Sequence, residues 1–126
     1  MDSLLRQVNE ILGQYTKNVD DRMKDVIEDA SKRARDELRS TSPKGPQGYA
    51  KSWAVKKGKG SKGIQNTVYN KDHYRLTHVL ENGHAIKNQH GSYGFWKPEK
   101  KHIQPVNDWI VEELPIWLEE ALKDVD

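Results

Sequence analysis

The chain has 126 residues, no cysteine, a net charge of only +2 and a mean hydropathy of −0.97. This length predicts a single domain over residues 1–126, and the lack of cysteine excludes disulfides and thiolate chemistry. With 34% hydrophobic residues, the core should be small, some apolar surface should be covered between subunits, and no apolar run is long enough to span a membrane.

Residues 2 to about 39 predict one long helix. Apolar residues recur every three or four positions from Leu4 to Leu38, and no proline interrupts them. If unbroken, about 38 residues form a rod of roughly 57 Å, which the rest of the chain is too short to cover. We therefore expect the far end to pack on another subunit, or the helix to break near Gly13 or Asn18.

The segment after the turn-rich residues 40–48 predicts a basic β-hairpin. Residues 49–56 and 64–69 have the pattern of half-buried strands, and a glycine-rich connection between them predicts antiparallel pairing with a long, mobile loop. Lysines at this tip could bind phosphate groups without sequence preference. The lysines concerned are Lys56, Lys57, Lys59 and Lys62. A solvated tip is the alternative, and the spacing does not match a phosphate-binding loop.

A short helix is predicted after the second strand. Leu76, Val79 and Leu80 share one helical face at positions i, i+3 and i+4. Asn70 or Asp72 can accept the first free N–H groups of the helix. Gly83 is expected to end it in the left-handed conformation with positive φ.

The polar stretch 86–101 predicts an irregular loop with aromatic residues. Phe95 and Trp96 are expected to begin a third strand that runs toward Ile103. Because an exposed aromatic side chain is a common anchor between proteins, Tyr93, Phe95 and Trp96 are candidate subunit-interface residues. A loop folded back over the sheet is the alternative.

The last helix is predicted to begin with Pro105 at its first position and to kink at Pro115. Together the elements predict an α+β fold. A long N-terminal helix covers residues 1–40, and residues 45–126 form a small, mostly antiparallel sheet, a short central helix and a C-terminal amphipathic helix packed on the sheet.

Charge is unevenly distributed along the chain. Residues 1–40 contain eight basic and nine acidic residues, residues 41–104 twelve and three, and residues 105–126 one and seven. The net charges are therefore −1, +9 and −6. This segregation could bring the basic region of one subunit to the acidic helix of the next. The alternative is neutralisation within one chain.

Candidate chemistry is sparse. Of the five histidines, only His73 and His78 lie close in sequence, and their spacing of five does not place them on one helical face. A His78–Glu81 pair is geometrically possible on the short helix. Since no acid–base pair accompanies a nucleophile motif, we predict no catalytic, metal or cofactor site and no enzyme activity.

One stretch resembles a family signature. Tyr74 to Gly83 has the form Tyr-Arg-Leu-x-His, two apolar residues, Glu-x-Gly, and after a polar loop Ile103 to Pro105 has the form apolar-x-Pro. This arrangement resembles the tail completion, or head–tail joining, proteins of long-tailed bacteriophages. The resemblance extends over roughly residues 45–126, and to the N-terminal helix by length and position. The matching residues, expected to define the fold, are Tyr74, Arg75, Leu76, Glu81, Gly83, Ile103 and Pro105.

The resemblance implies an architectural virion protein without a cofactor. Such proteins form a ring, typically a hexamer, between the connector's stopper ring and the tail tube or its terminator, with DNA passing through the lumen. The expected place is the neck of the virion. Because the first residues lack the order of a signal peptide, assembly is expected in the host cytoplasm. No membrane is expected to be involved, since no apolar run is long enough to span one. A DNA-binding module that uses the lysine-rich hairpin is the alternative function, and a small nuclease is a third.

Overall fold

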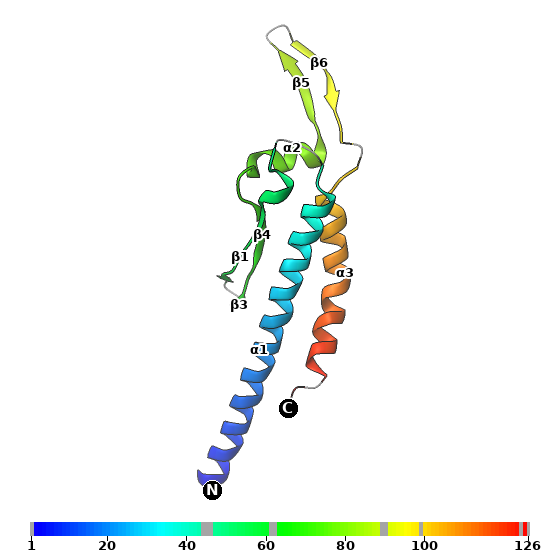
Figure 1. Cartoon of the computed structure of the whole chain (residues 1–126). Helices are drawn as coiled ribbons and strands as arrows, with labels where there is room; N and C mark the ends of the chain where they lie inside the picture. Colours follow the sequence, from blue (N-terminus) through cyan, green and yellow to red (C-terminus); the bar gives the residue numbers. More distant parts are fainter. Residues whose placement is uncertain are drawn as a thin grey trace.

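The computed structural model describes residues 2–43, 47–60, 63–88, 91–98, 100–123 and 125, and of residues 84–88 and 91–94 it describes the backbone alone. The elements, in chain order, are α1 (Asp2–Thr41), η1 (Ala50–Ser52), β1 (Trp53–Lys56), β2 (Lys59–Gly60), β3 (Gly63–Ile64), β4 (Thr67–Asn70), η2 (Tyr74–Leu76), α2 (Thr77–Asn82), β5 (His84–Asn88), β6 (Gly91–Trp96) and α3 (Ile103–Leu122). The molecule is elongated, with the β5–β6 hairpin at one end and the N-terminal half of α1 at the other (Figure 1).

Helix α1 runs unbroken from Asp2 to Thr41, so the long helix is confirmed and the predicted break near Gly13 or Asn18 is wrong. A single glycine costs a helix only about 1 kcal/mol relative to alanine, which a helix of this length tolerates. The Asn18 side chain accepts a hydrogen bond from the Gln14 amide one turn earlier, at 3.0 Å.

Strands β1 and β4 form the predicted antiparallel hairpin, with Trp53 opposite Asn70. The glycine-rich connection is paired as well, since β2 and β3 extend the hairpin. Tyr49–Ser52, however, was predicted as strand and forms a turn with η1. Gly48 has φ +88°, and the Ser52 hydroxyl donates to the Gly48 carbonyl at 2.6 Å. A serine that bonds to nearby backbone favours a turn over a strand ladder.

Residues 84–96 form a second antiparallel hairpin where an irregular loop was predicted. It pairs His84 with Trp96 and Asn88 with Gly91, and its register shifts between Ile86 and Lys87. Phe95 and Trp96 therefore end strand β6 and do not begin a strand toward Ile103. This hairpin stands away from the helices (Figure 1). The described strands thus form three separate two-stranded ladders.

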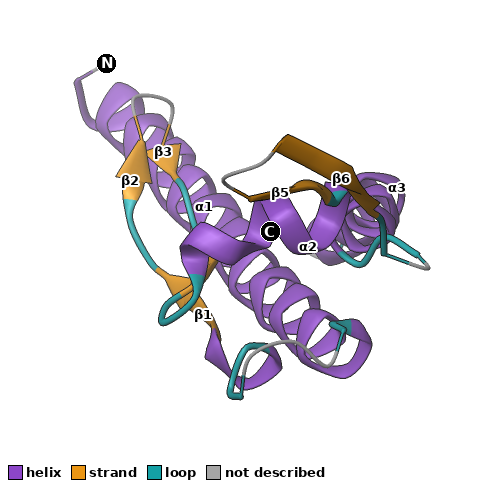
Figure 2. Cartoon of the chain, turned by 90° about the horizontal axis from the view of Figure 1, so that it is seen from above, coloured by secondary structure: helices purple, strands orange, loops and turns teal. Residues whose placement is uncertain are grey.

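The core forms where α1, the β1–β4 hairpin and α3 meet. Its buried apolar residues are Ala34, Leu38, Tyr49, Trp53 and Val106, with Val68, Leu80, Ile103, Trp109 and Ile110 packed around them. The hairpin and α3 lie on opposite sides of α1 (Figure 2). The expected packing of the C-terminal helix on the sheet is therefore limited to its first turns, and most of α3 lies along α1.

Helix α3 begins at Ile103, so Pro105 is its third residue and not its first. A proline in the first turn costs no helical hydrogen bond, because N–H groups there have no partner within the helix. Pro115 lies inside the helix, which continues to Leu122. Across the described ranges, no helix is long and apolar enough to cross a membrane.

Candidate assembly surfaces

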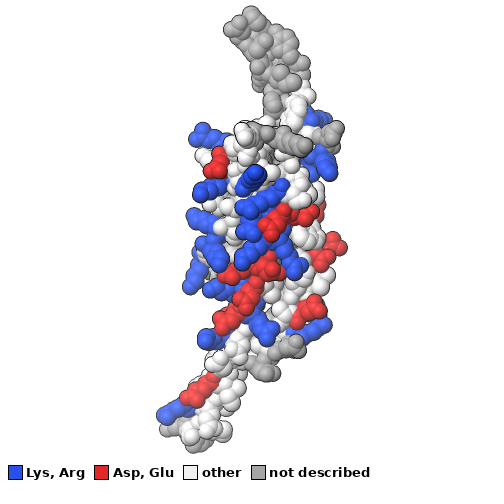
Figure 3. Space-filling model, viewed as in Figure 1, with Lys and Arg blue, Asp and Glu red and all other residues white. Residues whose placement is uncertain are grey.

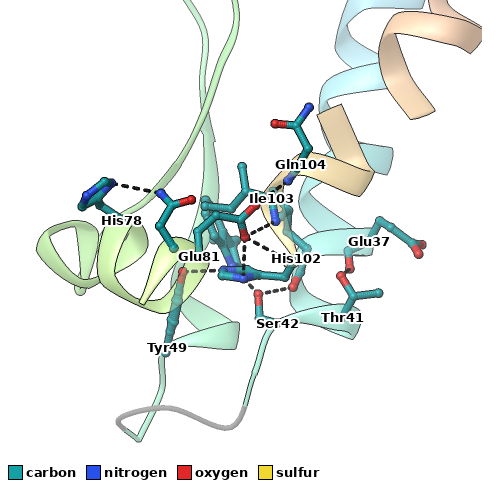
Figure 4. Close-up of polar contacts among 12 residues, drawn as sticks. Glu37, Thr41, Ser42, Tyr49, His78, Glu81, His102, Ile103 and Gln104 are labelled. Atoms are coloured by element: carbon teal, nitrogen blue, oxygen red, sulfur yellow. Dashed lines mark hydrogen bonds and ion pairs between the residues drawn. The ribbon is translucent and has the colours of Figure 1, made fainter. Parts of the chain in front are cut away.

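Glu81 connects the short helix α2 to the start of α3. The residue is 7% exposed. One carboxylate oxygen accepts the N–H groups of His102 and Ile103, and the other accepts that of Gln104, each at 2.8 Å (Figure 4). Residue His102 at the helix start provides no side-chain cap of its own. A carboxylate 21 residues earlier in the chain therefore caps α3, where the helix dipole favours a negative charge.

His102 and Tyr49 extend this junction into the core. The His102 ring is 2% exposed, and its Nε2 lies 2.8 Å from the Tyr49 hydroxyl. Its Nδ1 lies 3.0 Å from Glu81 Oε1, but out of line for a hydrogen bond. The Asn70 amide donates to the Tyr49 carbonyl at 2.9 Å, so the same cluster also holds the end of β4.

Burial and hydrogen bonding together set the ionisation states of this junction. Burial alone would raise the pKa of Glu81, but the three backbone N–H groups and His102 outweigh it and the pKa is lowered. Burial lowers the pKa of His102 despite the opposing charge of Glu81, so the ring is neutral at pH 7. Burial, with a smaller contribution from Glu81, raises the pKa of Tyr49 to about 12. A single carboxylate therefore sits among neutral partners, an arrangement suited to holding elements together.

Gly83, the last residue of the family signature's helical part, makes a close backbone contact. Its φ of +84° is positive as predicted, but its ψ of −179° is extended and not left-handed helical. A Cβ at this position would overlap the carbonyl oxygen of Trp96 and meet the ring of Phe95. Glycine is therefore required both for its conformation and for the approach of β6.

In the described part of the chain, Tyr74, Arg75 and Leu76, the first three signature residues, donate or accept no hydrogen bond with Glu81 or His102. Tyr74 is 60% exposed, and the Arg75 guanidinium lies 5.7 Å from its ring centroid. Leu76 is half-buried. The possible His78–Glu81 pair does not form, because Glu81 turns inward while His78 Nδ1 lies 3.2 Å from the Asn82 amide. Among the described residues, no group of three or more His, Asp or Glu could hold a metal ion.

The lysine-rich hairpin lies beside acidic residues of α1. Lys57 Nζ lies 3.3 Å from Glu28 Oε1. Lys59 lines the same surface hollow as Asp20 and Asp21. Lys56 is exposed, and Lys62 lies outside the described residues. Because α1 neutralises part of this charge, the geometry favours a solvated tip over a free phosphate-binding tip.

The aromatic interface candidates lie at the base of the β5–β6 hairpin. Phe95 is 54% exposed and Trp96 is 37% exposed. The Tyr93 side chain lies outside the described part of the chain. Figure 1 places this base next to α2 and the start of α3, at the root of the projecting end.

A larger apolar surface lies at the opposite end, on α1. Six large apolar side chains there are between 42% and 68% exposed: Leu4, Leu5, Val8, Ile11, Leu12 and Tyr15. We call these six residues the α1 stripe. Two further apolar residues, Val111 and Ile116, are exposed on the outer face of α3. Sequence reasoning missed this pair, although both fall between acidic residues, outside the core-facing positions of the helix.

Comparison with known proteins identifies a family. A family model described as "Bacteriophage HK97-gp10, putative tail-component" matches residues 2–83. The match includes α1, which the resemblance in the sequence covered only by its length and position. It ends at Gly83, before the apolar-x-Pro half of the signature. No curated protein and no solved structure matches the chain.

Proposed function

Because this chain belongs to the HK97-gp10-like family of bacteriophage tail components, we propose that it completes the top of the tail as a ring of identical subunits. The ring would join the tail tube or its terminator to the stopper of the head connector. A tail component is a structural protein of the virion; the position at the neck and the ring, of six copies by resemblance, are the proposal.

The α1 stripe is the observation that carries this proposal. Six large apolar side chains stay exposed on a chain whose buried core is small. Contiguous exposed apolar surface of this kind marks a protein contact site. The chain therefore has the surface of a subunit that is completed by its neighbours.

The shape suits a joint between two different neighbours. The β5–β6 hairpin projects from one end of the core, and the N-terminal half of α1 extends beyond α3 at the other (Figure 1). In a ring whose subunits stand along the tail axis, these two ends would face the connector and the tail. Phe95 and Trp96 would then lie near one junction and the α1 stripe near the other.

The test is a joining experiment with the phage that encodes this chain. Disrupting its gene should yield filled heads and separate tails of normal length in negative-stain micrographs. Purified protein added to these lysates should join heads to tails and restore infectivity. The double substitution Leu5→Asp with Leu12→Asp should fail to do so, because it places charge within the α1 stripe.

Lys17→Gln, a change at an exposed residue outside the α1 stripe, serves as the control and should join normally. Joined virions in the absence of the protein would refute the proposed role. Tails that are missing or of altered length would assign the chain to an earlier step of tail assembly.

A further inference from the structure

The outer face of α3 is acidic. The helix contains five acidic residues and no lysine or arginine. At 100° per residue, Asp108, Glu112 and Glu119 fall within one narrow sector, opposite the core-facing side. All three are exposed. No basic residue of the same helix can neutralise them, so the charge of this face stays available to a partner.

The β1–β4 hairpin carries the opposite charge. Lys51, Lys56, Lys71 and Arg75 are all exposed on or next to it. Asp72, the exposed acidic residue among them, accepts a hydrogen bond from the Ser52 hydroxyl at 3.2 Å. In Figure 3, Lys and Arg side chains gather along the hairpin side of the molecule, and acidic side chains lie over α1 and toward α3.

Each charged face also exposes apolar side chains. Val111 and Ile116, which are 66% and 53% exposed, flank the acidic sector of α3 on either side. Tyr69 is 36% exposed and pairs with Ala54 across the hairpin. Ala54 follows the buried Trp53 in β1, and successive side chains of a strand point to opposite faces. Tyr69 therefore lies on the outer face of the hairpin. The two faces therefore match in charge, and both offer apolar contact that can supply affinity.

The two faces cannot meet within one chain, because α1 lies between them (Figures 1 and 2). From this arrangement we propose that the basic hairpin face of one subunit docks on the acidic α3 face of the next copy of this chain. Complementary patches on opposite sides of a subunit give a head-to-tail contact, which closes into a ring when the rotation permits. A nucleic acid would satisfy only the basic face, whereas a second copy satisfies both.

This inference rests on the proposed ring and identifies the contact between its subunits. The test is a charge exchange in the full-length chain. Glu112→Lys with Glu119→Lys reverses the acidic face, and Lys56→Glu with Lys71→Glu reverses the basic face. All four residues are exposed, so folding should be unchanged. Each pair alone should reduce the number of subunits bound per tail by about tenfold, because like charges then face each other.

Combining all four substitutions should restore binding to within about twofold of the unaltered chain, since every contact again joins opposite charges. Glu10→Lys with Asp25→Lys makes the same charge change as the acidic-face pair, at exposed sites on α1, and should bind normally. The readout is the number of subunits on tails purified from phage that lack the gene, together with the sedimentation mass of the free chain at low salt.

A fourfold variant that binds as poorly as either pair would overturn the contact, as would pairs that bind like the unaltered chain. The joining role is scored separately, by head attachment. If the exchange behaves as expected on tails but heads never attach, the contact stands and the joining role fails. If heads attach but the fourfold variant is not restored, the joining role stands and this contact fails.

Discussion

At position 83, the backbone conformation and the packing both require glycine. Its φ of +84° is unfavourable for other residues, and a Cβ would overlap the Trp96 carbonyl. We expect Gly83→Val to lower the free energy of unfolding by at least about 1–2 kcal/mol. Gly13→Val is the matched control, because nothing lies within 4 Å of a Cβ there, and it should change stability by less than about 0.5 kcal/mol. Urea denaturation measures both, and equal effects would contradict the assigned role of Gly83.

The Glu81–His102 junction should make the fold sensitive to acid. Burial lowers the folded-state pKa of His102 below 6.5, so the unfolded chain takes up a proton first and stability falls as pH drops below 6.5. Burial opposes the shift of Glu81, but its hydrogen bonds prevail and its pKa is below 4.5 in the fold. The stability from Glu81 is therefore complete above pH 4.5 and is lost as pH falls through the folded-state pKa. Urea denaturation at a series of pH values should show both losses.

Glu81→Gln separates the two losses. The variant should lose about 1–3 kcal/mol at neutral pH, because charge-assisted bonds to three N–H groups are weakened. It should keep the decline just below pH 6.5 and lose the one below 4.5. An acid profile identical to that of the unaltered chain would show that other carboxylates cause the lower step.

The alkaline side of the same junction gives a further test. Burial raises the Tyr49 pKa from 10.0 to about 12, so stability should be constant below pH 10 and fall as pH rises toward 12. Tyr49→Phe should remove this fall, although it also removes the hydrogen bond to His102. The two chains are compared by the slope of their free energy of unfolding against pH above 10. This slope does not depend on the lower stability of Tyr49→Phe at neutral pH.

Most roles in this junction could not be predicted from sequence. Glu81 was expected only to define the fold, because the N–H groups that donate to its carboxylate belong to residues 21 to 23 positions later. One signal was available. The segment before α3 offers no Ser, Thr, Asp or Asn at the helix start, so the free N–H groups there needed an acceptor from elsewhere. The sequence therefore indicated that a side chain with an acceptor oxygen was required. Which residue supplies it depends on the tertiary structure.

At the scale of elements, the two halves of α1 share one pattern but differ in burial. Leu38 is 5% exposed in the core, whereas Leu12 is 58% exposed in the α1 stripe. Leu38→Ala should therefore lower the free energy of unfolding by about 2–5 kcal/mol. Leu12→Ala should change it by less than about 0.5 kcal/mol while reducing incorporation into tails. Denaturation and quantification of the chain in purified virions measure the two effects, and a large stability loss for Leu12→Ala would place the α1 stripe in the subunit's own core.

Sequence patterns predicted α1, the β1–β4 hairpin and α2, and failed for residues 84–96 and Tyr49–Ser52. Some 40 residues of helical pattern identify α1, and the β-branched and aromatic residues identify β1 and β4. Residues 84–96 contain too few alternating apolar residues to indicate a hairpin. Tyr49–Ser52 has strand-like alternation, but the local bond from Ser52 to Gly48 determines a turn. The secondary structure of such short segments depends on local side-chain hydrogen bonds and on pairing with another strand.

At the scale of the whole molecule, charge sets the orientation of subunits and apolar surface supplies most of the affinity. Exposed charge pairs contribute about 0–1 kcal/mol each and are screened by salt. A contact made of such pairs alone would disappear at high ionic strength. Because Val111, Ile116 and Tyr69 lie on the charged faces, raising ionic strength from about 0.05 M to about 0.5 M should weaken assembly without abolishing it.

Trp96 gives the sharpest test of this division between charged and apolar contacts. Its side chain is 37% exposed at the base of the projecting hairpin, and a large aromatic residue at an interface commonly contributes more than 1 kcal/mol. Trp96→Ala should therefore reduce the number of subunits per tail more than Lys57→Gln or Lys59→Gln does, and its effect should persist at high salt. Lys17→Gln, at an exposed residue outside the α1 stripe and both charged faces, is the control and should bind normally. If the assembled particle instead places Trp96 within its own subunit and far from every neighbour, the hairpin base is not an interface, and the α1 stripe and the α3 face must supply the apolar contact.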